Sequence, residues 1–446
     1  MTRRPYLATA FFCANLTGAG VLALGGCSDS PSQTEPPVQD PPAMQRPQLS
    51  YYQDVKPLME RYCTTCHRSG DIGPFTLTDY NAVMTHAPLI KNSVEAGRMP
   101  PWLPANTGLP LRYSRELRPA DKQLLLDWIA AGSPAGDPAM PARTDIRPAD
   151  SETAPRPDMV LKAPQPYQPD TTSTDDYHCF VFDPKLDHDR FLVAGQVNPD
   201  NRAIAHHMAL FLISPAQADQ VRALDKTGTG YTCFGGPGKN ISGGLLLGWA
   251  PGGTSMRAPT GTAFRIPKGS LLVMQMHYNI VANNGKPDQT TVALELGDTQ
   301  PDRELVSIFL AKPNLRIKAG DPNWKETIAA PVSALISRSG LPAGDITVYG
   351  VFPHMHLLGR RIAVSTVGGP MAVEIPRWDF HWQNTFTFVN PVTMHPTDVV
   401  QLECDYDNST ANQPVINGMQ QPPRDVTWGE STLDEMCVTV LTAAAK

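Results

Sequence analysis

A proline-rich stretch at residues 138–166 separates two parts of this 446-residue chain that differ in hydrophobic pattern. Before it, apolar residues recur at helical spacing, as in PADKQLLLDWIAAG, where Leu125 and Trp128 share one face and Gly132 is a stop signal. After it, short runs rich in Val, Ile, Phe, Thr and Tyr alternate with Gly, Pro, Asn and Asp turns. We therefore expect a multidomain protein, with a small all-α domain followed by all-β jelly rolls or sandwiches. The β part is too long for a single sandwich, so we expect two.

Composition supports this division and excludes one class of partner. The 45 prolines and 34 glycines favour loops, short strands and linkers over helical bundles. The formal net charge is −6, and no basic stripe runs along any segment. Nucleic acid is therefore excluded as an expected partner.

The first residues have the layout of an export signal. Arg3 and Arg4 precede an apolar run that ends in Leu-Gly-Gly before Cys27, which resembles the bacterial lipobox. We expect a lipoprotein signal peptide at 1–26, a lipid on Cys27 and a Pro-rich tether at 27–48. The expected location is the bacterial cell envelope, lipid-anchored to a membrane and facing the periplasm or held at the outer membrane. An ordinary cleaved signal with an incidental cysteine stays open.

The motif Cys63-Thr64-Thr65-Cys66-His67 has the spacing that attaches c-type heme. Two thiols on one turn reach the two vinyl groups of the porphyrin, and the adjacent imidazole becomes an iron ligand. A zinc knuckle is the rival interpretation, but it needs a second ligand pair, and no suitable cysteine pair follows. The sequence therefore predicts one covalently bound heme c within a cytochrome c domain at 49–137.

The sixth iron ligand is predicted to be Met99, in GRMPPW. This methionine follows the second helical stretch, and its surroundings resemble the distal methionine loop of small class I cytochromes. His86 is the competitor. A His/Met pair raises the heme potential and suits electron transfer.

Two histidine motifs lie in the β part. In FPHMHLLG, His354 and His356 share one face of a strand because side chains alternate, and Met355 points the other way. Adjacent His206 and His207 face opposite sides of a flat strand, so both can bind one metal only at a strand end or a bulge. Each motif alone is a weak metal signal, and a surface or hydrogen-bonded core histidine is the alternative.

The order of these motifs is more specific than either one. AHHM is followed by PKGSLLVMQMHY at 267–278, then by HMHLLGR and by WGESTLDEMC at 428–437, with YHCF, WDFHWQ and LECDYDNST between and around them. This series resembles the copper type II, ascorbate-dependent monooxygenases, which include the peptidylglycine and dopamine enzymes. The resemblance covers roughly residues 167–441. It implies two jelly-roll copper domains, predicted here at 167–302 and 303–446.

The resemblance also implies the site residues. His206, His207 and His277 would bind an electron-storing copper; His354, His356 and Met436 would bind the catalytic copper where oxygen reacts. Imidazole suits both oxidation states of copper, and a thioether favours Cu(I). Matching the family, Cys179 would pair with Cys233, and Cys404 with Cys437.

The implied reaction is R–H + O2 + two electrons and two protons giving R–OH and water. The fused heme predicts that a periplasmic electron donor supplies these electrons in place of ascorbate. Phe352 and Pro353 stand where amidating relatives hold a substrate carboxylate with arginine, which favours a small neutral or lipophilic organic substrate. Two alternatives stay open: a heme and copper electron-transfer or copper-binding lipoprotein without oxygenase activity, and a structural or redox-sensing lipoprotein.

Overall fold

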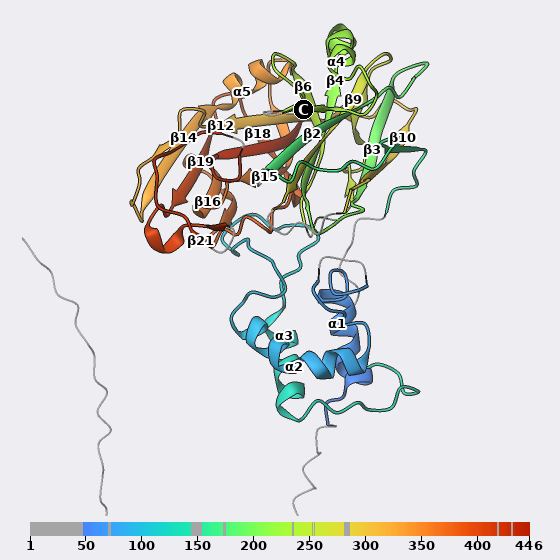
Figure 1. Cartoon of the computed structure of the whole chain (residues 1–446), viewed down its shortest axis with the longest axis vertical. Coiled ribbons are helices and arrows are strands. Elements are labelled where there is room, and N and C mark those ends of the chain that lie inside the picture. Colours follow the sequence, from blue (N-terminus) through green and yellow to red (C-terminus); the bar gives the residue numbers. More distant parts are fainter. Residues whose placement is uncertain are drawn as a thin grey trace, which may run out of the picture. The chain divides into compact units, whose positions relative to one another are not determined.

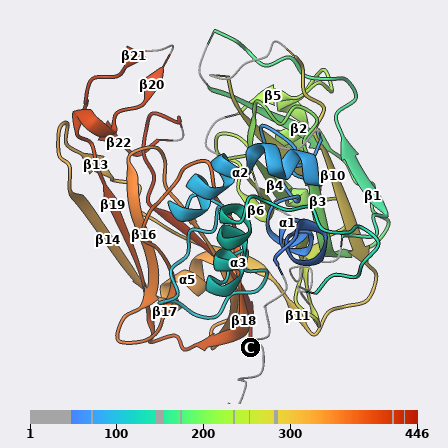
Figure 2. The ribbon, with the colours of Figure 1, turned by 90° about the horizontal axis from the view of Figure 1, so that it is seen from below.

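The computed structural model describes residues 48–69, 73–143, 154–172, 175–233, 236–251, 253, 255–280, 286–416, 419–429 and 431–446. The predicted signal peptide, Cys27 and all of the predicted tether except Gln48 lie outside the described residues. The chain divides into two units, Met1–Gln48 and Leu49–Lys446. The second unit is largely β-sheet with a short helical region at its start (Figures 1 and 2).

The helical region contains one π-helical turn and three α-helices: η1 (Tyr51–Val55), α1 (Lys56–Tyr62), α2 (Tyr80–Glu95) and α3 (Pro119–Ala130). Helix α2 begins where the Asp79 side chain accepts the backbone N–H of Ala82 at 3.0 Å. Helix α3 buries Leu125 and Trp128, as its periodicity predicts, and Gly132 follows it with a positive φ of 85°. Together with η1, the three helices enclose a small apolar core.

Two sheets form the first β domain. One has the order β5-β2-β9-β4-β6, and the other β1-β10-β3-β8-β11 with β7 also paired to β3. Their strands are β1 (Met159–Lys162), β2 (Asp175–Phe182), β3 (Arg190–Asn198), β4 (Ala205–Ile213), β5 (Tyr231–Thr232), β6 (Gly243–Trp249), β7 (Met256–Arg257), β8 (Thr262–Ile266), β9 (Leu271–Asn279), β10 (Thr291–Gly297) and β11 (Arg303–Glu304). The short helices η2 (Pro215–Gln217) and α4 (Ala218–Leu224) follow β4. Side chains from both sheets form one core.

The second β domain also has two main sheets, ordered β12-β23-β15-β18 and β14-β19-β16-β17. Their strands are β12 (Val306–Ala311), β14 (Trp324–Pro331), β15 (Ile346–His354), β16 (Gly359–Thr366), β17 (Met371–Ile375), β18 (Phe386–Met394), β19 (Val399–Tyr406) and β23 (Val438–Ala445). Two-stranded pairs and short helices complete the domain: β13 (Arg316–Ile317) with β22 (Val426–Thr427), β20 (Val415–Ile416) with β21 (Met419–Gln420), α5 (Val332–Ser339) and η3 (Thr410–Asn412). The expectation of a largely β-sheet chain that follows a short helical region is confirmed for the described residues.

The pattern of each strand agrees with its place in the sheet. Strand β9 is central and buried along almost its whole length, so apolar residues predominate in its sequence LLVMQMHY and do not alternate with polar ones. Strand β10 alternates buried and half-buried residues because one of its faces covers the core. The two β domains share part of one core, since Tyr349 and Ala444 of the second domain pack within the core cluster of the first.

Two segments belong to other parts of the fold than the predicted domain boundaries assign them to. Residues 159–162, predicted as linker, form edge strand β1 because MVLK pairs with β10. Residues 102–112, predicted to belong to a separate helical domain, run along the second β domain. There the backbone N–H of Leu109 donates to Ala372 (3.1 Å), and Leu111 forms a β-bridge with Phe388. Backbone pairing with open strand edges accounts for both placements.

Both implied disulfides are present: Cys179–Cys233 and Cys404–Cys437. Cys63 and Cys66 belong to neither bridge. Among the helices in the described part of the chain, none has the length and apolar character needed to cross a membrane.

Candidate metal centre

Three histidines meet where strands β4 and β9 pair. His207 lies opposite His277 in the register, and a bulge between Ala205 and His207 inserts His206 as an extra residue. The bulge turns both adjacent imidazoles to the same side, which a regular strand cannot do. The sequence analysis requires a strand end or a bulge for both histidines to bind one metal, and the bulge is present.

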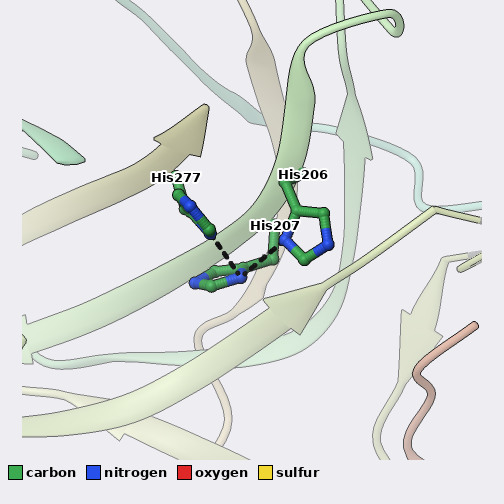
Figure 3. Close-up of side chains that lie close together, drawn as sticks. All are labelled: His206, His207 and His277. Carbon is green, nitrogen blue, oxygen red and sulfur yellow. Dashed lines mark hydrogen bonds between the residues drawn. The ribbon is translucent and has the colours of Figure 1, made fainter. Parts of the chain in front are cut away.

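The ring nitrogens of these histidines converge on one point (Figure 3). Nδ1 of His207 lies 3.3 Å from Nδ1 of His206 and 3.3 Å from Nδ1 of His277. Metal–imidazole bonds of about 2.0 Å at tetrahedral angles place two ligand nitrogens about 3.3 Å apart. The spacing therefore fits three imidazoles on one ion.

Burial keeps these three imidazoles neutral. Desolvation lowers the pKa of His206 and of His207 well below the usual value, with the neighbouring His277 adding to the effect. Burial also lowers the pKa of His277, against the opposing effect of its hydrogen bond to Asp175. The neutral imidazole is the form that binds a metal. Buried Nε2 of His206 has no hydrogen-bond partner among the described residues, whereas Nδ1 of the same ring faces His207.

Asp175 is a candidate site residue that sequence reasoning missed. Its carboxylate accepts Nε2–H of His277 at 2.7 Å, which leaves Nδ1 of that ring facing the cluster. A carboxylate behind a metal-binding histidine orients the ring and raises its basicity. The signal was weak in the sequence, because Asp175 stands on β2 and reaches His277 only through the pairing of β2 with β9.

The second histidine pair lies at the end of β15. His354 is the last residue of that strand and His356 lies just beyond it, with ring centroids 5.0 Å apart, while Met355 is buried in the domain core. Nδ1–H of His354 donates to the Gln383 amide oxygen (2.6 Å), and Nδ1–H of His356 donates to the Asp434 carbonyl (3.1 Å). Both rings therefore keep Nε2 for a ligand.

Burial lowers the pKa values of this pair, as it does in the first cluster. Burial lowers the pKa of His354 to about 4 and the pKa of His356 to about 3. Gln383, which holds His354, belongs to the WDFHWQ segment, but its role could not be assigned without the fold. His381 of the same segment is exposed and bonded to Asp379.

Met436 stands next to the Cys404–Cys437 bridge and before β23. It is buried among Val438, Val440 and neighbouring apolar side chains, and it lines the same cavity as His354 and His356. The cavity has a volume of about 940 Å³. A soft thioether and two imidazoles in one apolar cavity form a donor set suited to copper.

The other predicted site lies in the helical region. Nδ1–H of buried His67 donates to the Phe75 carbonyl at 3.0 Å, which leaves Nε2 for a ligand. A Cβ on Gly73 would lie 2.7–2.9 Å from atoms of Cys66 and His67, so the CxxCH turn has room only for glycine there. Cys63, Cys66, His67 and Met99 line the same cavity of about 940 Å³ that His354, His356 and Met436 line. His86 instead stacks on Phe75, with centroids 3.9 Å apart.

The remaining histidines have ordinary structural partners. His178 bonds to the Thr229 carbonyl and stacks on Tyr167. His188 and His395 pair with aspartates at the surface. These contacts fit structural roles.

Comparison with known proteins supports the copper assignment. Residues 312–442 match the family model "Copper type II ascorbate-dependent monooxygenase, C-terminal domain". Putative DBH-like monooxygenase protein 2 of Homo sapiens is 23% identical over 278 residues, which cover 59% of this chain and 50% of that protein. Dopamine beta-hydroxylase of Rattus norvegicus is 23% identical over 317 residues, which cover 66% of this chain and 46% of that protein.

The chain thus spans about half the length of the curated relatives it matches. These matches relate it to the copper type II ascorbate-dependent monooxygenases. Residues 312–442 do not include the Cys63–His67 motif, so heme remains a prediction. Among solved structures, the major capsid protein P2 of bacteriophage PM2 aligns over 64% of this chain and 97% of its own, with 8% identity and a TM-score of 0.25, too low to establish a shared fold.

Proposed function

We propose that this chain, whose residues 312–442 match a copper monooxygenase domain, is a copper-dependent monooxygenase that hydroxylates a C–H bond of a small organic substrate. The observation that carries the proposal is the convergence of His206, His207 and His277, with a second buried pair, His354 and His356, on the other domain. When bound, copper would supply the one-electron chemistry that dioxygen reduction requires.

The residues divide into two proposed ligand sets. His206, His207 and His277 would hold one ion, and His354, His356 and Met436 would hold the other. Asp175, Gln383 and the Asp434 carbonyl each hold the outer nitrogen of one ring, so the imidazoles are oriented before a metal arrives. The apolar residues around Met436 would exclude water from the place where substrate and oxygen meet.

The substrate proposed for this cavity is neutral or lipophilic. Phe352, Val438, Val440 and Trp428 pack around Met436 and make this part of the cavity apolar. A carboxylate or an ammonium group would lose its hydration beside these apolar side chains, while Arg112, Arg115 and Arg257 line other parts of the same cavity.

We also propose that Cys63, Cys66, His67 and Met99 bind heme c and that a periplasmic donor feeds electrons through it. A heme would supply electrons singly at a potential raised by a methionine ligand. The hydrogen bond from His67 to Phe75 and the tight contact at Gly73 support a preformed iron-ligand turn.

The two disulfides favour an oxidising, extracytoplasmic compartment, and a lipid on Cys27 would hold the protein at a membrane.

One experiment tests the oxygenase. The full chain, matured with heme and loaded with copper, would be reduced and mixed with ¹⁸O2 and a panel of neutral and charged substrates. We expect one ¹⁸O atom in an alcohol product of a neutral substrate, and no product from the Met436→Ala and His354→Ala variants. Copper and heme oxidation without labelled product from any substrate would favour the electron-transfer alternative.

Stopped-flow spectroscopy of the same material tests the heme. We expect the reduced heme band to decay on mixing with O2 and substrate, and to persist in the His354→Ala variant. Heme that stays reduced while the wild-type protein forms product would exclude it as the electron source.

A further inference from the structure

Residues 97–112, between α2 and α3, form a strap that lies on the second β domain. Within the strap, the backbone N–H of Ala105 donates to the Glu374 carbonyl (2.8 Å), and that of Leu109 donates to the Ala372 carbonyl (3.1 Å). Both acceptors belong to β17, the edge strand of the sheet β14-β19-β16-β17. The strap therefore covers an open edge of this sheet.

The strap also covers the edge of the other main sheet of this domain. The backbone N–H of Arg112 donates to the Thr387 carbonyl at 2.8 Å, and the N–H of Val389 donates to the Pro110 carbonyl at 2.8 Å. Thr387 and Val389 belong to β18, the edge strand of the sheet β12-β23-β15-β18. One segment from the helical region is thus bonded to an edge strand of both sheets.

Side-chain packing holds the strap in this position. Trp102 lies edge-on to Phe386 of β18, with ring centroids 5.7 Å apart at an interplanar angle of 84°, and Leu109 packs against the core of the domain. A Cβ on Gly108 would lie 2.8 Å from the Ala372 carbonyl oxygen, so only glycine lets the strap approach β17 this closely. The strap is therefore packed as a part of the second β domain.

Strands β17 and β18 are consecutive, and the loop that joins them, residues 376–385, holds the second histidine pair. Nε1–H of Trp378 donates to the His356 carbonyl at 3.0 Å, and the Gln383 amide oxygen accepts Nδ1–H of His354 at 2.6 Å. Both loop side chains are buried. The strap is therefore bonded to both of the strands that carry the ends of this supporting loop.

The same loop contacts the strap at its first residue. Nη2–H of Arg377 donates to the Gly97 carbonyl at 3.2 Å. Met99, the proposed sixth iron ligand, lies two residues further along the strap. Residues 376–385 thus have contacts to both ends of the strap, directly at Gly97 and through β18 at its other end.

From these contacts we infer that the strap positions Trp378 and Gln383, and through them His354 and His356, so that the helical region takes part in shaping the second ligand set. The inference rests on the proposed function, because it takes this histidine pair to bind copper. Its physical basis is that a loop is only as ordered as the strands at its ends, and edge strands that lose their backbone partners open more often.

Amide hydrogen exchange tests the inference without a metal. The metal-free full chain would be compared with the variant Trp102→Ala/Gly108→Ala, which removes the ring against β18 and adds a methyl group against β17. We expect the amides of the strap and of residues 376–385 to exchange about tenfold faster in the variant, and those of β9 to keep the wild-type rate. Gly244→Ala, where the nearest atom to a new Cβ is 4.0 Å away, is the matched control and should change none of these rates.

Copper affinity gives a second measurement. The same proteins would be loaded with Cu(I) and titrated with a chelator, and X-ray absorption would identify the copper at the second set by the sulfur of Met436. We expect the affinity at this set to fall about 10-fold in the double variant, as is typical when a partner behind a metal-binding histidine is disturbed. The affinity at the His206, His207 and His277 set should stay at the wild-type value. Trp102→Phe, which keeps an aromatic ring against β18, should remain close to the wild type.

The outcomes separate this inference from the proposed function. Faster exchange confined to the strap, with residues 376–385 and both copper affinities unchanged, would overturn the positioning role and leave the proposed oxygenase standing. Equal loss of affinity at both ligand sets would overturn it as well, because it would report a general loss of stability. Fewer than two coppers per chain in the wild-type protein would overturn the proposed function, while coupled exchange of the strap and the loop would still support the positioning role.

The single variant Gly108→Ala serves in place of the double variant if the latter does not fold. Its methyl group presses on the Ala372 carbonyl but leaves Trp102 in place, so we expect the same changes at smaller size. Strap amides that stay as protected as in the wild type would overturn the inference, since these contacts would then not be what holds the strap on the domain.

Discussion

The Glu435 carboxylate accepts the backbone N–H of His356 at 2.9 Å and thereby joins two segments that are distant in the sequence. The same side chain accepts the N–H of Leu358 (2.7 Å) and that of Met436 (3.1 Å). It is fully buried, and burial raises its pKa to about 8 in spite of these backbone donors. Glu435 is therefore a positioning residue for both the HxH turn and Met436.

Replacing Glu435 should damage stability and metal binding together. In Glu435→Gln the amide NH2 meets at least one backbone N–H, so we expect a loss of roughly 1–3 kcal/mol in the free energy of unfolding. Copper affinity at the His354 set should fall as well. Urea unfolding and competition with a copper chelator would measure the two effects. The neighbouring Asp434→Asn keeps the backbone carbonyl that holds His356 and removes only a partly exposed ion pair with Arg424, so it should leave both quantities nearly unchanged.

Asp175→Asn should weaken copper binding at the His206, His207 and His277 set. The amide oxygen can still accept from His277, but the loss of charge lowers the basicity of that ring, and such partners are typically worth about 10–100-fold in metal affinity. Asp176→Asn is a useful comparison, since Asp176 binds Tyr167 and not a proposed ligand. Equal losses of copper affinity in the two variants would argue against a specific role for Asp175.

Removal of the Cys404–Cys437 bridge should lower copper affinity as well as stability. Its 33-residue separation corresponds to a stabilisation of about 4 kcal/mol in the chain-entropy treatment. Because Cys437 adjoins Met436, the double variant Cys404→Ala/Cys437→Ala should also lose affinity for Cu(I) at the second site. Removing Cys179–Cys233 should lower stability without that loss, which calorimetry and Cu(I) titration would separate.

The metal-free protein should lose stability as the pH falls from about 6.5 towards 4. The pKa of His354 is about 4 in the folded chain, below its ordinary value, so the unfolded chain takes up a proton across this range and the folded chain does not. The stabilisation is complete above pH 6.5 and is lost as the pH approaches the folded pKa. Urea unfolding between pH 4.5 and 8 would measure it.

A His354→Gln variant should show a shallower pH dependence over the same range, because one depressed histidine is gone. Glu435 has the opposite effect on the pH dependence of stability. Its pKa is raised, so its stabilisation is complete below pH 4.5 and declines as the pH rises through about 8. An unchanged slope in His354→Gln would mean that other groups produce the acid sensitivity.

Gly73→Ala should impair heme attachment if Cys63–His67 is a heme motif. The added methyl group would press on Cys66 and His67 and displace the proposed iron ligand. The pyridine hemochrome spectrum of purified protein would report the heme content. Gly244→Ala, where the nearest atom to a new Cβ is 4.0 Å away, should keep the wild-type heme content.

Local pattern alone predicted several parts of this protein correctly. The helical periodicity of PADKQLLLDWIAAG predicted α3, and the short β-type runs expected after the linker correspond to strands such as β4 and β9. The closeness of His354 and His356 was also predictable, because the alternation of side chains along a strand depends only on the backbone.

The remaining contacts depend on the register in which distant strands and loops align. No short-range rule brings Asp175 behind His277 or Glu435 beneath His356, because each contact depends on how strands or loops far apart in the sequence align. The approach of His207 to His354 depends further on how two domains pack. The sequence by itself therefore determined which residue types are available for metal chemistry. Only the tertiary structure decided which polar groups hold them and how close the two sets lie, because long-range register and packing are properties of the whole folded chain.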